Sequence, residues 1–119
     1  MERLVIIPTY NEKENIESII TAVMELPLEF NVLVIDDGSP DGTAEIVKEL
    51  MAGPYAGRVH LVERSGKQGL GTAYIAGFKW AIEHKANYIF EMDADFSHNP
   101  NDLLKLYGAC ANNGAHLAI

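Results

Sequence analysis

The sequence predicts an α/β domain in which a mostly parallel sheet is flanked by helices on both faces. The first observation is that strand-like and helix-like segments alternate along the whole chain. The second is that the strand-like segments are continuous apolar runs, which are typical of strands covered on both faces. The third is that polar or glycine-rich residues follow each strand. In such sheets ligands bind beyond the carboxyl ends of the strands, so we expect a site at that edge.

The alternation can be followed from the N-terminus, with prolines and glycines marking the boundaries. The predicted strands are 4–7, 31–35, 58–62 and 87–92. The predicted helices run from Glu12 to about Leu26, from a cap at Asp41 to Met51, from the glycine-rich segment 65–71 to about His84, and from Asn101 to about Asn112. Right-handed crossovers would join the parallel strands.

Helical spacing also predicts which side chains of the last two helices face the core. For the third helix the expected apolar face comprises Ala73, Ile75, Ala76, Phe78 and Ile82. For the fourth it comprises Leu103, Leu104 and Leu106, with Cys110 as a small core residue. The final residues, 115–119, look like the first half of a fifth strand. We therefore expect residues 1–119 to be the N-terminal part of a single, longer domain.

Composition excludes several classes of protein. The chain has 119 residues, 48% of them apolar, which suffices for one domain with a core. Acidic residues outnumber basic ones, 17 to 9, which argues against a nucleic-acid surface and a polybasic membrane patch. No apolar run approaches the roughly 20 residues that span a bilayer, and no signal peptide is evident. A single cysteine excludes an internal disulfide and suits the cytoplasm.

The strongest candidate site is the Asp-x-Asp sequence at Asp93 and Asp95, directly after the fourth predicted strand. Residues two apart on an extended backbone point the same way, so both carboxylates can face one object. Close anions without an intervening base repel unless a cation joins them, and a hard divalent metal that also holds a phosphate is the natural partner. The alternative is a solvated turn. Four polar loops at one sheet edge favour the site.

Other polar residues at this edge have two interpretations each. Tyr10 can border a base or pack at the sheet edge, and Glu12 can cap its helix or bind a ligand. Asp36 and Asp37 point to opposite sides, so one must face the crevice. We assign that position to Asp37, which could accept hydrogen bonds from a ribose or a base, and regard Asp36 as a turn former. Lys67 can meet a phosphate or remain solvated.

Several familiar motifs are absent from the sequence. The segment 66–71 has the pattern G-x-x-G-x-G, which matches neither the phosphate loop nor the dinucleotide fingerprint, so a nicotinamide cofactor is not expected. Gly69 and Gly71 can still allow close approach of a ligand or of the sheet. No zinc-binding spacing or serine nucleophile elbow is present. His98 is interpreted as a loop residue, and the other histidines as structural or surface residues.

With these motifs placed, the sequence resembles the nucleotide-sugar-binding part of family-two glycosyltransferases of the GT-A fold, a truncated nucleotide-diphospho-sugar transferase fold. Within them it is most similar to the dolichyl-phosphate (polyprenyl-phosphate) mannose synthase branch. The resemblance is carried by segments 6–12, 34–43, 66–74 and 92–98. Ser-Pro-Asp-Gly-Thr at 39–43 and Gly-Leu-Gly-Thr-Ala-Tyr at 69–74 are the segments that indicate this branch.

The resemblance implies specific roles for residues of this chain. Asp93 and Asp95 would bind Mg2+ or Mn2+ bridging the donor diphosphate, with Ala94 and Ser97 beside the metal and sugar. The guanosine pocket would be lined by Pro8, Tyr10, Glu12, Ile35 and Asp37. The family's acceptor-binding arginines have no counterpart here, so the chain alone is not expected to turn over substrate.

The implied reaction is transfer of mannose from GDP-mannose to a polyprenyl (dolichyl-type) phosphate with inversion. A phosphate acceptor is already largely ionised at neutral pH, because its second pKa is about 6, so no catalytic base is assigned. The lipid acceptor would place the longer protein at the cytoplasmic face of the membrane. Alternatives are a family-two enzyme with a UDP-sugar donor, a nucleotidyltransferase, or an inactive nucleotide-sugar-binding module.

Overall fold

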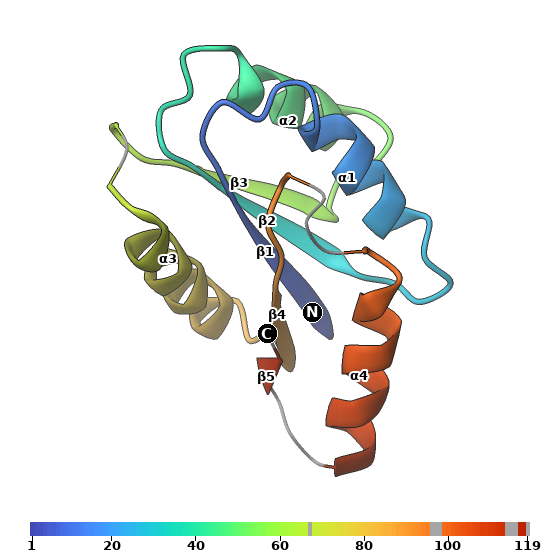
Figure 1. Cartoon of the computed structure of the whole chain (residues 1–119). Helices are drawn as coiled ribbons and strands as arrows, with labels where there is room; N and C mark the ends of the chain where they lie inside the picture. Colours follow the sequence, from blue (N-terminus) through green and yellow to red (C-terminus); the bar gives the residue numbers. More distant parts are fainter. Residues whose placement is uncertain (67, 96–98, 114–116, 119) are drawn as a thin grey trace.

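Strands and helices alternate in the predicted order in the computed structural model, which describes residues 1–66, 68–95, 99–113 and 117–118 (Figure 1). The elements are β1 (Arg3–Thr9), α1 (Ile16–Met24), β2 (Asn31–Asp36), α2 (Thr43–Ala52), β3 (Val59–Glu63), α3 (Leu70–Glu83), β4 (Tyr88–Glu91), α4 (Asp102–Asn113) and β5 (Leu117–Ala118). The sheet has the order β3-β2-β1-β4-β5, and each of its pairings is parallel. The predicted fold class is therefore confirmed.

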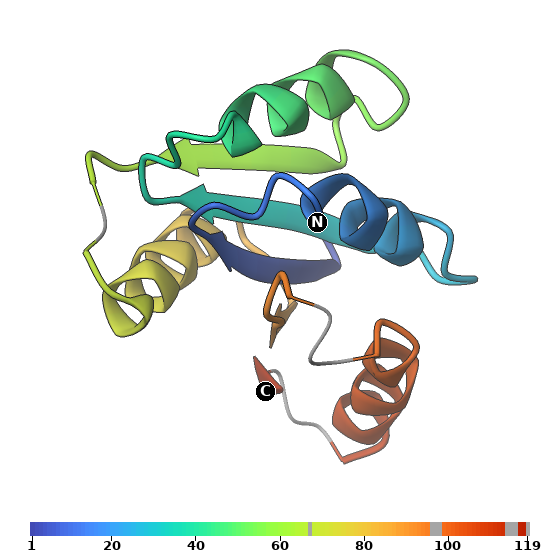
Figure 2. The same ribbon diagram turned by 45° about the horizontal axis from the view of Figure 1, so that its top comes forward.

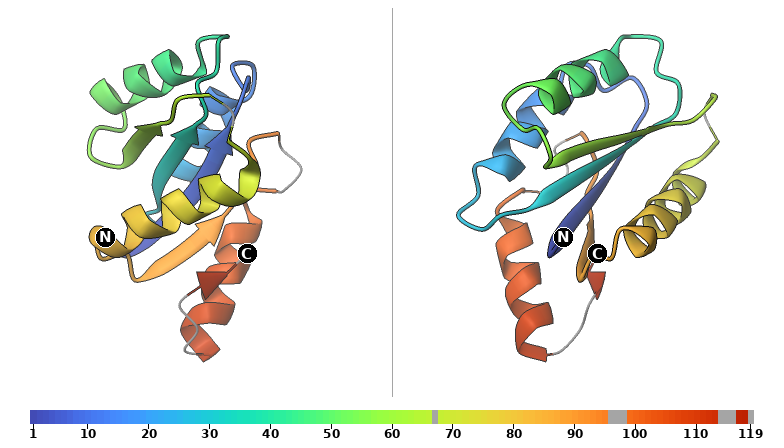
Figure 3. Two further views of the ribbon diagram at one scale, coloured as in Figure 1. Left: turned by 90° about the vertical axis from the view of Figure 1, so that its left-hand side faces the viewer. Right: turned by 180° about the vertical axis from the view of Figure 1, so that it is seen from behind.

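Helices cover both faces of the sheet, as expected. One face packs against α1, α2 and α4, and the other against α3 (Figures 2 and 3). Alternation along β1 accounts for this arrangement, because Val5 and Ile7 belong to the larger core whereas Leu4 and Ile6 face α3. All four of these side chains are fully buried. β1 is thus a central strand, and residues that follow it lie between the loops of β2 and β4.

The prediction for the apolar face of α3 was partly wrong. Ile75 and Ile82 are 54% and 71% exposed, respectively. The buried residues of α3 are small and lie one turn apart: Ala73, Gly77 and Ala81. A Cβ atom on Gly77 would lie 2.7 Å from Cγ2 of Ile6, so only glycine permits this close approach of α3 to β1.

Tertiary contacts also shift some predicted boundaries. α1 begins at Ile16 rather than Glu12: residues 13–15 form a turn, and the backbone N–H groups of Glu12 and Lys13 donate to side chains of the next loop. β1 continues through Pro8, where a missing N–H is harmless because pairing with β4 stops at Ile6.

Other predicted packing positions agree with the structure. Leu103 and Cys110 are buried, while Leu104 and Leu106 pack against the core from half-buried positions. β5 adds a short edge next to β4. Within the described part of the chain, no helix combines the length and apolar character needed to cross a bilayer.

Candidate functional site

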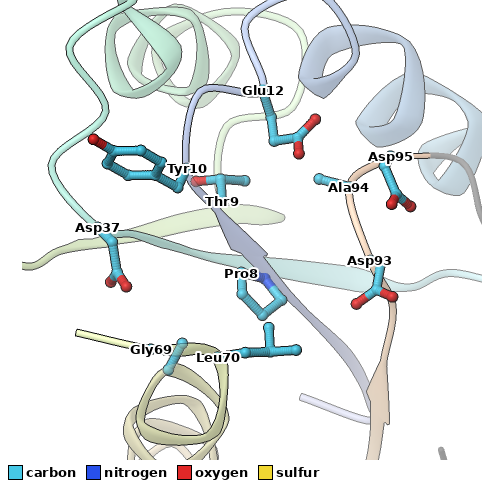
Figure 4. Close-up of a pocket in the computed structure, with 11 residues that line it drawn as sticks. Pro8, Thr9, Tyr10, Glu12, Asp37, Gly69, Leu70, Asp93, Ala94 and Asp95 are labelled. Carbon is cyan, nitrogen blue, oxygen red and sulfur yellow. The ribbon is translucent and has the colours of Figure 1, made fainter. Parts of the chain in front are cut away.

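A cavity of about 330 Å3 opens at the carboxyl edge of the sheet (Figure 4). It lies where the strand order reverses between β1 and β4, the usual ligand position in open α/β sheets. Residues from all four predicted loops line it: Pro8, Thr9, Tyr10, Glu12, Asp37, Gly69, Leu70, Ala73, Asp93, Ala94 and Asp95. The expectation that these loops converge is confirmed.

The loop after β1 is fastened to the loop after β2 by a row of hydrogen bonds. The backbone N–H groups of residues 11–13 donate, in chain order, to Oγ of Ser39, Oγ1 of Thr43 and Oδ2 of Asp41, at 2.9, 3.1 and 3.1 Å. The alternating polar residues of Ser-Pro-Asp-Gly-Thr therefore serve as a scaffold. They fix the loop that carries Tyr10 relative to the end of β2.

Asp41 has a second function at the start of α2. It precedes the cap residue Gly42 and accepts hydrogen bonds from the N–H and hydroxyl of Thr43, at 3.1 and 2.5 Å. Burial opposes its charge, but these bonds and the one from Lys13 outweigh burial and lower the pKa of the Asp41 carboxyl. The predicted capping position was thus one residue too early, although the carboxylate still binds the first helical N–H.

Asp36 and Asp37 face opposite sides, as predicted. Asp36 is buried and accepts hydrogen bonds from the hydroxyl of Thr9 and from the N–H and hydroxyl of Ser39, at 2.7, 3.0 and 2.7 Å. It is the turn former that the sequence indicated. Asp37 lines the cavity and is bound through both oxygens by Arg64, at 2.7 and 2.9 Å.

Arg64 was not predicted as a site residue. Its guanidinium also donates to the hydroxyl of Thr72 at 3.1 Å and to the carbonyl of Gly69 at 3.4 Å. It therefore joins Asp37 to the first turn of α3. An added Cβ would meet no atom within 4 Å at either Gly69 or Gly71, but Gly69 lines the cavity with φ 101°, a conformation that favours glycine. Only Gly69 thus supports the predicted need for glycine.

Asp93 and Asp95 line the cavity on the β4 side. In Figure 4, they and Ala94 lie on one side of Pro8, opposite Tyr10 and Asp37. The reason given from the sequence needs correction, because β4 ends at Glu91 and the chain turns at 94–95 instead of continuing extended. The turn, not strand alternation, brings both carboxylates to the same cavity.

A tyrosine that was not predicted as a site residue contacts one of these acids. The hydroxyl of Tyr74, on α3, donates to Oδ1 of Asp93 at 3.1 Å. Burial, followed by the charge and hydrogen bond of Asp93, raises the pKa of Tyr74. Burial and the charge of Asp93 also raise the pKa of Glu91. The charge of Asp93 thus opposes ionisation of both neighbouring groups.

The donor set fits a divalent cation that is shared with a ligand. Asp93 and Asp95 provide hard carboxylate oxygens, while the described residues contain no cluster of three His, Cys, Asp or Glu able to hold a metal without a ligand. Magnesium is commonly held by one or two carboxylates together with substrate phosphates. The cavity therefore suits a cation whose remaining ligands come from a diphosphate or water.

One predicted residue lies outside the cavity, and two are not among the described residues. Ile35 is fully buried in the core under α3 and does not belong to the cavity lining, so its expected position in the pocket was wrong. Its side chain lies between the sheet and α3. Lys67 and Ser97, like His98, fall outside the described residues.

The fold and the site together define a Rossmann-like α/β domain with carboxylates around a cavity at the switch point of its sheet. The family model described as glycosyl transferase family 2 matches residues 4–119. The chain belongs to that glycosyltransferase family, which confirms the resemblance seen in its motifs.

Solved structures show the same fold. TarS of S. aureus superposes with a TM-score of 0.74 at 24% identity, over 96% of this chain and 33% of that chain. A mannosyltransferase from Pyrobaculum calidifontis, solved in complex with GDP-Man and Mn2+, gives 0.73 at 26% identity, over 92% and 32%. The predicted GT-A fold is confirmed.

Two curated relatives are much more similar in sequence. Polyprenol monophosphomannose synthase of Mycolicibacterium smegmatis is 49% identical over 117 residues, which are 98% of this chain and 43% of that protein. Undecaprenyl-phosphate mannosyltransferase of Micrococcus luteus is 44% identical over 109 residues, 92% of this chain and 44% of that protein. The chain spans less than half the length of either relative.

Proposed function

We propose that this chain forms the donor-binding part of an inverting glycosyltransferase that moves mannose from GDP-mannose to a polyprenyl phosphate. The observation that carries the proposal is that Asp93 and Asp95 line one cavity with Tyr10 and Asp37, at the switch point of the sheet. The relatives named for polyprenol and undecaprenyl phosphates, and the neighbour solved with GDP-Man and Mn2+, support this choice of substrates.

The two sides of the cavity suit the two ends of the donor. Tyr10 is 37% exposed at the cavity and can border the guanine ring, while Asp37 offers carboxylate oxygens to N–H groups of the base. Pro8 and Glu12 complete this guanosine side. That Lys67 contacts a phosphate of the donor remains a prediction.

Opposite them, Asp93 and Asp95 would hold Mg2+ or Mn2+ against the diphosphate, with Ala94 and the predicted Ser97 beside the sugar. The acids of the cavity would otherwise repel a diphosphate, so a cation should strengthen its binding. A bound divalent cation supplies Lewis-acid stabilisation of the charge that develops on the leaving diphosphate.

The transfer itself needs no protein base. An oxygen of the acceptor phosphate forms a bond to the anomeric carbon of mannose while the bond from that carbon to GDP breaks, and GDP leaves with the electron pair. The acceptor is already an oxyanion at neutral pH, because the second pKa of a phosphate monoester is about 6. Since a polyprenyl chain resides in a bilayer, we place the enzyme at the cytoplasmic face of the membrane.

Calorimetry with the chain tests the donor assignment. GDP-mannose, UDP-glucose and GTP are titrated with and without Mn2+, and we expect the tightest Mn2+-dependent binding for GDP-mannose. Preference for UDP-glucose would indicate another family-two donor, and preference for GTP would indicate a nucleotidyltransferase.

A matched pair of variants tests the metal ligands. Asp95→Ala should remove the Mn2+ dependence of GDP-mannose binding, whereas Asp102→Ala should not, because Asp102 is an exposed acid on α4 outside the cavity. Equal Mn2+ dependence in both variants would contradict the role of Asp95.

A further inference from the structure

We infer that Tyr74 is a positioning residue that orients Asp93 toward the cation of the donor site. This inference rests on the proposed function, since it concerns the carboxylate assigned there to Mg2+ or Mn2+. Tyr74 does not line the cavity, so its effect would pass through Asp93. The geometry that carries it is the 3.1 Å hydrogen bond from the phenol to Oδ1 of Asp93.

The two partners differ in how firmly the fold holds them. Asp93 follows the end of β4 and precedes a turn. Tyr74 lies on α3, between the buried Ala73 and the close contact of Gly77 with β1, and its ring packs against the smaller core. A rigid helix thus presents a hydrogen-bond donor to a side chain on an irregular segment. Such a bond selects one orientation of the carboxylate before a ligand arrives.

The chemistry of the pair is compatible with coordination of a cation. A neutral phenol donates one hydrogen bond, and an ionised carboxylate has about four acceptor sites, so the bond does not exhaust the capacity of Asp93. Hydrogen-bonded partners of metal ligands typically change metal affinity by 10–100-fold when they are removed. We expect an effect near the lower end, because the phenol is one neutral donor.

Tyr74→Phe provides the test, because it removes the hydroxyl and keeps the ring. Mn2+ binding is measured by electron paramagnetic resonance of free Mn2+ at saturating GDP-mannose, and thermal unfolding is followed by circular dichroism. We expect an increase of about tenfold in the apparent Kd for Mn2+, with an unchanged Tm. GDP-mannose binding without metal should also stay unchanged.

Tyr55→Phe is the matched control. Tyr55 lies in the loop between α2 and β3, at the edge of the sheet opposite the cavity, and packs against the larger core. Its substitution should leave Mn2+ affinity unchanged.

The outcomes separate the two proposals. Absence of Mn2+-dependent binding in the unmodified chain would overturn the proposed function itself. Mn2+-dependent binding that is equal in the unmodified chain and in Tyr74→Phe would overturn only the positioning role. An equal loss in Tyr55→Phe, or a Tyr74→Phe variant that does not fold, would also overturn it, because the hydroxyl would then act on stability alone.

Discussion

Replacing Arg64 by alanine should destabilise the protein by about 3 kcal/mol, because it leaves a buried carboxylate without its main partner. The side chains of Arg64 and Asp37 are only 12% and 7% exposed. Removing one partner of a buried ion pair typically costs about 3–5 kcal/mol. We expect the lower end, since the N–H of Gln68 still donates to Asp37 at 3.2 Å and the pair retains some contact with water.

Urea unfolding at pH 7, followed by circular dichroism, measures this cost. Asp37→Asn and the double variant complete a mutant cycle, and the double variant should be more stable than the sum of the single effects implies. Lys48→Ala is the matched control, because the pair of Lys48 with Glu63 is 3.2 Å long but about half exposed, and such pairs contribute at most about 1 kcal/mol. A cost for Arg64→Ala no larger than for Lys48→Ala, or an additive cycle, would refute the reasoning.

Three further predictions concern packing and pH. In urea unfolding, Gly77→Ala should be less stable than Gly108→Ala by about 1–3 kcal/mol because of overpacking. An added Cβ would lie 2.7 Å from the buried Ile6 at Gly77 but would meet nothing within 4 Å at Gly108. Equal stabilities of the two variants would contradict this close packing. Burial and then a neighbouring histidine lower the pKa of His60, so the free energy of unfolding should fall as pH decreases below about 6.5. His60→Gln should lessen that fall, and an unchanged pH profile would exclude His60 as its source. The lowered pKa of Asp41 adds stability above about pH 3.9 that is lost as pH falls further, and an acid titration of Asp41→Asn should lack this contribution.

Much of the site could be predicted from the sequence because each of its acids follows a strand. In a parallel sheet the carboxyl ends of the strands meet at one edge, so the positions of Tyr10, Asp37, Asp93 and Asp95 followed from the strand boundaries alone. The argument from strand alternation was wrong for Asp93 and Asp95, but both residues do line the cavity at the predicted edge of the sheet. Asp93 and Asp95 reach the same cavity through a turn, because a short segment leaving one strand has few other places to go.

The side-chain contacts that hold Asp37 and Asp93 could not be predicted in this way. Arg64 is 27 residues from Asp37, and Tyr74 is 19 residues from Asp93. Their pairing depends on the placement of β1 between β2 and β4 and on how closely α3 approaches the sheet, which no local pattern specifies. The exposed Ile75 illustrates the same limit, since periodicity favoured a bulky stripe where a stripe of small residues is buried. The prediction for Ile35 was wrong for a different reason. The family resemblance placed it in the pocket, whereas its side chain lies on the face of β2 that α3 covers.

The unpredicted contacts have one element in common, the N-terminal half of α3. Its first turn binds Arg64 through Thr72 and so reaches Asp37 on one side of the cavity, while Tyr74, two residues further, reaches Asp93 on the other side. The depth of this helix is set by the contact of Gly77 with β1, one turn later. A shift of α3 would therefore disturb both sides of the cavity together, so we expect the overpacking in Gly77→Ala to weaken the proposed Mn2+ binding as well as stability.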